Sequence, residues 1–137
     1  MLKLRKNKKG FTLVELIVVI AIMAVLAGTV AGVTVSQLNK QSDKTTENQA
    51  KTLANSISQY IIEDDSITVS GTAINATLKT EIEKNYPSLK LKYDSETTQK
   101  GDIYVKMVDG KIEVGYHKKT GNEPAKVATI NAEGVVE

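Results

Sequence analysis

The sequence predicts an α+β fold in which a long N-terminal helix packs on a small antiparallel β-sheet. Three observations carry this prediction. Residues 16–35 are apolar apart from two glycines and two threonines, and an apolar stripe with helical spacing follows at residues 50–61. The last third of the chain alternates apolar and polar residues around Asp109-Gly110. A sheet packed on the second half of the helix would bury the apolar faces of both.

The apolar run is long enough to cross a membrane. As a helix, residues 16–35 would extend about 30 Å, the hydrocarbon thickness of a bilayer. The residues before the run carry positive charges and no acid, at Lys3, Arg5, Lys6, Lys8 and Lys9. The positive-inside rule places this flank in the cytoplasm and the rest of the chain across the membrane. We therefore expect a single-pass precursor in the cytoplasmic membrane.

The junction before the run carries a specific resemblance. KKG followed by FTLVELIVVIAIMAVLA resembles the class III leader and mature N-terminus of type IV prepilins and of type II secretion and competence pseudopilins. In that family a membrane aspartyl peptidase cuts after the glycine and methylates the new terminal amine. The resemblance, over roughly residues 8–35, implies cleavage between Gly10 and Phe11, N-methylation of Phe11, and a fifth-position acid at Glu15.

Composition fits an exported domain with little chemistry. The net charge is +2, but the leader holds five of the eighteen basic side chains and no acid, so its removal leaves about −3. The basic balance belongs to the targeting segment, and no nucleic-acid binding is predicted. Cysteine is absent, which excludes disulfides and thiolate metal sites. Many family members close their C-terminal loop with a cystine pair, so this chain must use packing or backbone hydrogen bonds.

Glu15 has two compatible interpretations. Thr12 to Glu15 form a T-x-x-E capping box, which would begin a helix. An ionised acid in a membrane segment is also costly, by about 2.5–3.5 kcal/mol at the bilayer centre, and so points to a functional partner. The partner that the resemblance implies is the Phe11 ammonium of a neighbouring subunit. This pairing would offset desolvation and penalise subunits docked out of register.

Small residues gather further along the run, at Gly28 and Gly32. A small-xxx-small pattern lets helices approach closely in an apolar medium, although glycine is common enough in membrane helices for the pair to arise by chance. The glycines and the β-branched residues around them also lower helix propensity. In many pilins a proline stands at the position that matches Gly32, and the resemblance implies a weak helical segment there.

The sequence as a whole predicts four regions. We expect a leader at 1–10, a transmembrane and assembly helix at 11–38, an amphipathic continuation at 39–65, and a globular head at 66–137. Within the head we expect an extended piece at 67–71 and a short helix through Ile74, Leu78 and Ile82 that ends at Tyr86-Pro87. Strands are expected at 89–93, 102–108, 111–117, 127–130 and 134–137, with a hairpin turn at Asp109-Gly110. This is the order of elements of the pilin-like fold.

No catalytic or metal-binding pattern stands out in the head. The single histidine, His117, has no partners in the sequence pattern and is expected on the surface. The acids Glu63 to Asp65 lack the spacing of a calcium loop, and Asn75-Ala-Thr fits a short glycosylation sequon that often arises by chance. We predict no enzyme, no cofactor and no metal.

The predicted function is a structural subunit of a type IV pilus, with the absence of a long loop or insertion favouring a major pilin. Its expected partners are copies of itself, the prepilin peptidase, the assembly platform and minor pilins. The precursor would wait in the membrane and then join an extracellular filament. The alternatives are a type II secretion or competence pseudopilin and a membrane-tethered binding domain that never polymerises. Adhesion, motility, DNA uptake and secretion are not distinguished by the sequence.

Overall fold

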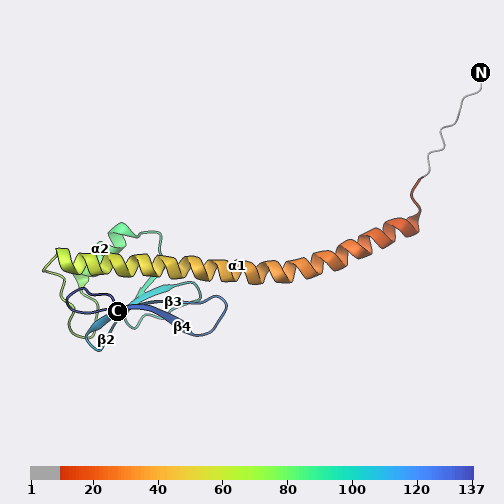
Figure 1. Cartoon of the computed structure of the whole chain (residues 1–137). Coiled ribbons are helices and arrows are strands. Elements are labelled where there is room, and N and C mark those ends of the chain that lie inside the picture. Colours follow the sequence, from red (N-terminus) through yellow and green to blue (C-terminus); the bar gives the residue numbers. More distant parts are fainter. Residues whose placement is uncertain (1–9) are drawn as a thin grey trace, which may run out of the picture. The chain divides into compact units, whose positions relative to one another are not determined.

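The structure, a computed structural model, describes residues 10–137. The chain divides into two compact units with the boundary between Gln37 and Leu38. One helix, α1, spans Leu13–Glu63 and contributes to both units (Figure 1). The predicted leader, apart from Gly10, and its basic residues lie outside the described residues. The architecture is the predicted α+β fold of a long helix and a four-stranded sheet.

The second half of α1 supplies one side of the head core. Its buried positions include the predicted stripe of Ala50, Leu53, Ala54, Ile57 and Ile61. These side chains join one apolar cluster with the sheet and with α2. The other faces of this half carry polar residues such as Lys51 and Asn55, which are exposed. Amphipathic periodicity therefore fixes which face of the helix meets the sheet.

The short helix α2 spans Ala76–Asn85, where the sequence predicts it. Asn75 caps its first turn, because the Asn75 side chain accepts a hydrogen bond of 2.8 Å from the Thr77 N–H. Leu78 and Ile82 are fully buried. The helix ends at the predicted place, since Pro87 follows Tyr86 and disfavours helical geometry at the residue before it.

The sheet contains β1 (Leu91–Tyr93), β2 (Ile103–Val108), β3 (Lys111–His117) and β4 (Pro124–Ile130), in that order. Strands β2 and β3 form the predicted hairpin, with Val108 opposite Lys111. Both turn residues have positive φ, 51° at Asp109 and 74° at Gly110. These angles fit a type I′ turn, whose twist suits a two-residue hairpin.

Two details of the sheet differ from the prediction. The sheet is mixed, because β1 pairs with β2 in parallel, with Leu91 opposite Ile103. The chain turns at Asp94, whose φ is 48°, and residues 95–102 return to the starting end of β1 before β2 begins. The expected last strand at 134–137 is reduced to an isolated bridge between Val136 and Ile130.

The residues expected as an extended piece at 67–71 form no strand. They nevertheless contribute to the core, since Ile67 and Val69 are buried. The N–H group of Ile74 is bound just beyond them by both oxygens of Asp94, at 3.1 Å. Burial of these side chains and the hydrogen bonds to Asp94 stabilise this segment, which is not paired with a strand.

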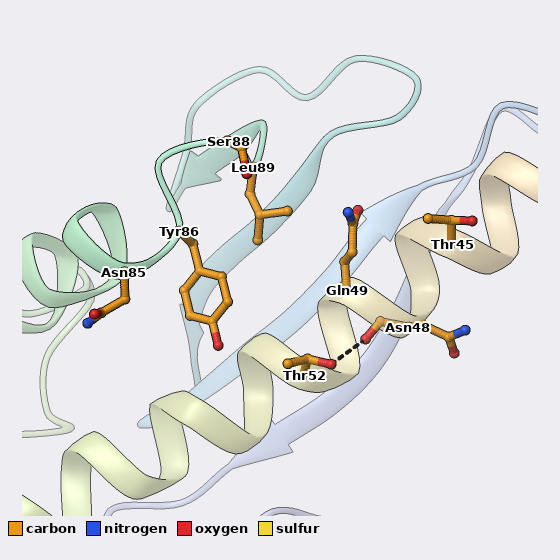
Figure 2. Close-up of a pocket in the computed structure, with 8 residues that line it drawn as sticks. All are labelled: Thr45, Asn48, Gln49, Thr52, Asn85, Tyr86, Ser88 and Leu89. Atoms are coloured by element: carbon orange, nitrogen blue, oxygen red, sulfur yellow. Dashed lines mark hydrogen bonds between the residues drawn. The ribbon is translucent and has the colours of Figure 1, made fainter.

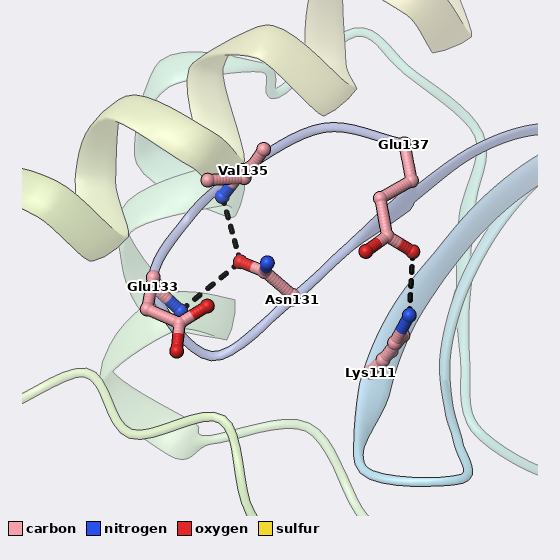
Figure 3. A network of polar contacts seen from close by, with 5 residues as sticks. All are labelled: Lys111, Asn131, Glu133, Val135 and Glu137. Carbon is pink, nitrogen blue, oxygen red and sulfur yellow. Dashed lines mark hydrogen bonds and ion pairs between the residues drawn. The ribbon is translucent and has the colours of Figure 1, made fainter.

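Hydrogen bonds close the C-terminal loop, as the absence of cysteine requires (Figure 3). The Asn131 side-chain oxygen accepts bonds from the N–H groups of Glu133 and Val135, at 3.1 and 2.8 Å. The Ser58 hydroxyl of α1 donates to the Gly134 carbonyl. The Glu137 side chain pairs with Lys111 at 2.5 Å. Local polar contacts thus bind the end of the chain to the hairpin and to α1.

Candidate assembly site

The predicted cleavage junction lies in exposed, non-helical backbone. Residues 10–12 precede α1, and Gly10 and Phe11 are both exposed, Phe11 to 85%. A Cβ built at Gly10 meets no atom within 4 Å. Nothing within the described residues therefore shields this peptide bond from a protease.

Glu15 and Thr12 form the predicted capping box. The Thr12 N–H donates to Glu15 Oε2 at 3.0 Å, and the Glu15 N–H donates to Thr12 Oγ1 at 3.3 Å. Two of the free N–H groups at the start of α1 are satisfied in this way. The capping bond involves Oε2, and no donor among residues 10–137 is bonded to Oε1. Glu15 follows Phe11 by four residues, and Phe11 lies just before the first residue of α1.

The first unit exposes its apolar side chains around the whole circumference of the helix. Every described residue from Gly10 to Leu38 is exposed, including Leu16, Ile20 and Val30. By length and composition this part of α1 could cross a membrane. Monomeric soluble proteins rarely expose a contiguous apolar surface of this size. The segment therefore requires lipid or other apolar helices around it.

Gly28 and Gly32 lie four residues apart on one face of this segment, about 20 Å along the helix from Glu15. A Cβ added at either glycine would meet open space. Thr29 and Thr34 donate their hydroxyls to the carbonyls of Leu26 and Val30, at 2.9 and 2.8 Å. These bonds hide the hydroxyls from an apolar medium and tend to bend helices slightly. The helix is nevertheless continuous through the glycines.

The N-terminal part of the chain matches a known family motif. Residues 5–31 match the family model of the prokaryotic N-terminal methylation motif. This motif is the class III prepilin leader signature of type IV pilins and pseudopilins. The match supports a precursor that resembles those of type IV pilins and pseudopilins in its N-terminal part. No curated protein and no solved structure gave a match to the chain.

The described residues of the head contain few candidates for a catalytic or metal-binding site. The His117 side chain forms a hydrogen bond between Nε2 and the Asn122 carbonyl at 3.1 Å. Within residues 10–137 no group of histidine and acidic side chains could hold a metal ion. Burial raises the pKa of Tyr93 to about 12, so this phenol stays neutral at physiological pH. The Asn75 side chain donates to Ser66 and Thr68, which engages the amide nitrogen of the possible sequon.

A groove runs between α1 and the segment that follows α2 (Figure 2). It has a volume of about 410 Å³ and is lined by Thr45, Asn48, Gln49, Thr52, Asn85, Tyr86, Ser88 and Leu89. The Tyr86 hydroxyl, at its edge, is bonded to the Ser56 hydroxyl at 2.6 Å. The other polar lining groups are amides and aliphatic hydroxyls, so the groove lacks an acid, a base or an activated nucleophile.

Sequence reasoning missed a buried carboxylate that fixes the head to α1. Asp43 accepts hydrogen bonds from the N–H groups of Lys119 and Thr120, at 2.7 and 3.2 Å, and from the Thr120 hydroxyl at 2.5 Å. Burial alone would raise the pKa of Asp43, but these bonds and the nearby Lys118 charge outweigh it and lower the pKa below 3.8. Position 43 continues the apolar stripe at helical spacing from Ala50, and this spacing could have revealed it.

Proposed function

We propose that this protein is a structural subunit of a type IV pilus-like filament. Its precursor is held in the cytoplasmic membrane by α1 with the N-terminus in the cytoplasm. The prepilin peptidase cleaves it between Gly10 and Phe11 and methylates the Phe11 amine. The assembly platform and minor pilins then bring it into a helical polymer of its own copies, on the cell surface.

The observation that carries this proposal is the methylation motif at residues 5–31, at the start of a helix whose apolar side chains up to Leu38 are all exposed. A lone membrane anchor has no need of the cleavable Gly10-Phe11 junction or of an acid inside the apolar segment. Cleavage would free an ammonium group on Phe11, four residues before Glu15. In a polymer, the Glu15 carboxylate of one subunit pairs with the Phe11 ammonium of a neighbour, and the apolar helices bury one another.

Gly28 and Gly32 also support this proposal, through helix packing and low helix propensity. Because open space surrounds both glycines in the single protomer, they leave room for a neighbouring helix to approach closely. The low helix propensity of this segment also allows it to lengthen during polymerisation. Neither property serves a head that is only tethered to a membrane.

Substitution of Gly10 by leucine tests the proposed function. We expect a full-length precursor that stays in the membrane, no mature chain on immunoblots, and no filaments by electron microscopy. Ala21→Leu, a comparable change within the apolar segment, serves as the control for membrane insertion and should still be cleaved. Normal processing and filaments from Gly10→Leu would overturn the proposal.

A further inference from the structure

The head, taken here as the second unit of the chain (residues 38–137), carries a cluster of positive charges at one end. This is the end where α1 enters the head, and three hydrogen bonds from backbone N–H groups hold its segments together. The Ile103 N–H bonds to the Lys90 carbonyl, the Gly101 N–H to the His117 carbonyl, and the Lys119 N–H to Asp43. The basic end is made up of the exposed lysines Lys40, Lys44, Lys90, Lys100, Lys118 and Lys119.

The acids nearby are fewer than the lysines. Asp43 and Asp102 are buried, and both accept hydrogen bonds from backbone N–H groups, Asp102 from that of Gln99 at 2.8 Å. Glu47 is paired with Lys51 at 2.7 Å. Glu123 is the exposed acid in the loop between β3 and β4. The basic end therefore presents a predominantly positive surface.

The opposite end of the head is acidic. It combines the end of α1, the hairpin turn and the C-terminal loop, which are held together by the Ser58–Gly134 bond and by the bridge of Val136 to Ile130. The acidic end is made up of the exposed residues Glu63, Asp64, Asp65, Asp109, Glu133 and Glu137. Lys111 accompanies them and is paired with Glu137.

The acidic end also exposes apolar side chains. Ile62 is 65% exposed and Val135 is 55% exposed, and Val108 and Val136 are also exposed. Ile62 lies close to Gly134, whose added Cβ would meet the Ile62 side chain at 2.9 Å, and Val135 follows Gly134 in the chain. Apolar side chains rimmed by charged ones are typical of protein interaction surfaces.

We propose that the acidic end of one head binds the basic end of the head of a second copy. The two surfaces lie at opposite ends of the same unit and carry opposite charge, so copies can repeat the contact head to tail without limit. Such a heterologous contact produces an open filament and not a closed dimer. Contacts between like ends would bring like charges together and are disfavoured. This inference rests on the proposed function, because it assigns the polymer a second contact beyond the apolar helices.

A second copy fits these surfaces better than a polyanion does. The head from residue 38 onward contains thirteen lysines and fifteen acids, so its total charge is small while its two ends differ in sign. A nucleic acid or another polyanion would occupy the basic end alone. It would leave the acidic end and the exposed Ile62 and Val135 without a partner.

Cysteine crosslinking in cells tests this contact directly, because the native chain contains no cysteine. The full-length variant combines Lys118→Cys at the basic end with Asp65→Cys at the acidic end. These positions are separated by about 30 Å of α1 within one head, which prevents crosslinking inside a subunit by a short bis-maleimide. We expect a ladder of multimers from the double variant and at most dimers from either single variant.

A matched pair and a charge swap control the result. Lys84→Cys replaces Lys118→Cys in the control pair, since Lys84 is an exposed lysine on α2 outside both ends. This pair should give no ladder. Lys44→Glu or Glu133→Lys added to the ladder-forming variant should weaken the ladder, and both together should restore it. Salt near 1 M should also weaken it, since charges are then screened within about 3 Å.

The outcomes separate this inference from the proposed function. Filaments with no ladder from the Lys118→Cys, Asp65→Cys variant would overturn the end-to-end contact, leave the basic end to an anionic partner, and keep the filament proposal. A ladder without surface filaments would support the contact and count against the pilus. The absence of both would overturn both proposals.

Discussion

At the scale of single residues, carboxylates determine how separate segments meet. Asp43 connects α1 to the loop after β3, and Asp94 holds the N–H group of Ile74. Glu15 caps the first turn of its own helix. In each case a side-chain carboxyl oxygen accepts a hydrogen bond from a backbone N–H group of another residue. Asp43 and Asp94 therefore position segments far from their own place in the chain, and Glu15 acts on its own helix.

Glu15 allows the capping role to be separated from the proposed charge pairing. Glu15→Val removes both, and we expect normal cleavage at Gly10 but few filaments. Glu15→Gln can retain the capping bond, because glutamine also completes a capping box, yet it carries no charge. If charge pairing drives assembly, the glutamine variant fails as the valine variant does. Filament yields counted by electron microscopy and cleavage followed on immunoblots make the comparison, and wild-type yields from Glu15→Gln would refute the pairing.

We expect the stability of the head to depend on pH through Asp43. Because its pKa is lowered in the folded state, its contribution is present above pH 3.8 and is lost as the pH falls below that value. Asp43→Ala should lower the free energy of unfolding by roughly 1–3 kcal/mol at pH 7, and by much less at pH 3. All five tyrosines lie between residues 60 and 116, so near-ultraviolet circular dichroism of the detergent-solubilised chain reports on the head. Lys44→Ala, at an exposed neighbouring position, is the control, and an equal loss at both pH values would contradict this account.

At the scale of elements, local sequence patterns predicted most of the fold. The helical stripe from Ala50 to Ile61 and the Asp109-Gly110 turn both depend on neighbouring residues, and both are confirmed. The parallel direction of β1 depends on the crossover at residues 95–102, which has no strong pattern of its own. The sequence of β1 fits a strand of either direction, so antiparallel pairing was the wrong expectation there.

The first half of α1 allows the role of its glycines to be tested apart from head folding. Gly32→Leu fits the single protomer, where open space surrounds the glycine, but in a filament it would press against a neighbouring helix. We expect normal cleavage and head stability with a strongly reduced filament yield. Val30→Leu, which enlarges a different face of the helix, should assemble normally. Wild-type filaments from Gly32→Leu would show that no helix packs closely at this position.

At the scale of the whole molecule, the two units carry different features. The first carries the methylation motif and an apolar helix, and the second carries a core built from α1, α2 and the sheet. The sequence identified the candidate assembly residues because Gly10, Phe11 and Glu15 stand at fixed spacing in a short motif. It could not reveal the two charged ends of the head, because their residues are scattered from Lys40 to Glu137 and meet only after folding.

The distribution of the protein along surface filaments distinguishes the members of its class. An antibody raised against residues 66–137 should label filaments along their whole length if the protein is the repeating subunit. Immunogold electron microscopy makes the measurement, with cells that express only Gly10→Leu as the negative control. Labelling confined to filament tips, or no labelled filaments, would contradict a major subunit.

The polar closure of the C-terminal loop has a consequence for where the head can fold. Its last residues are held by Asn131, Ser58 and Lys111, and no cysteine takes part. If the head is exported as proposed, it needs neither a thiol oxidase nor a disulfide isomerase to reach its native state. Its folding then does not depend on disulfide formation in its surroundings, and can proceed with or without oxygen as an oxidant.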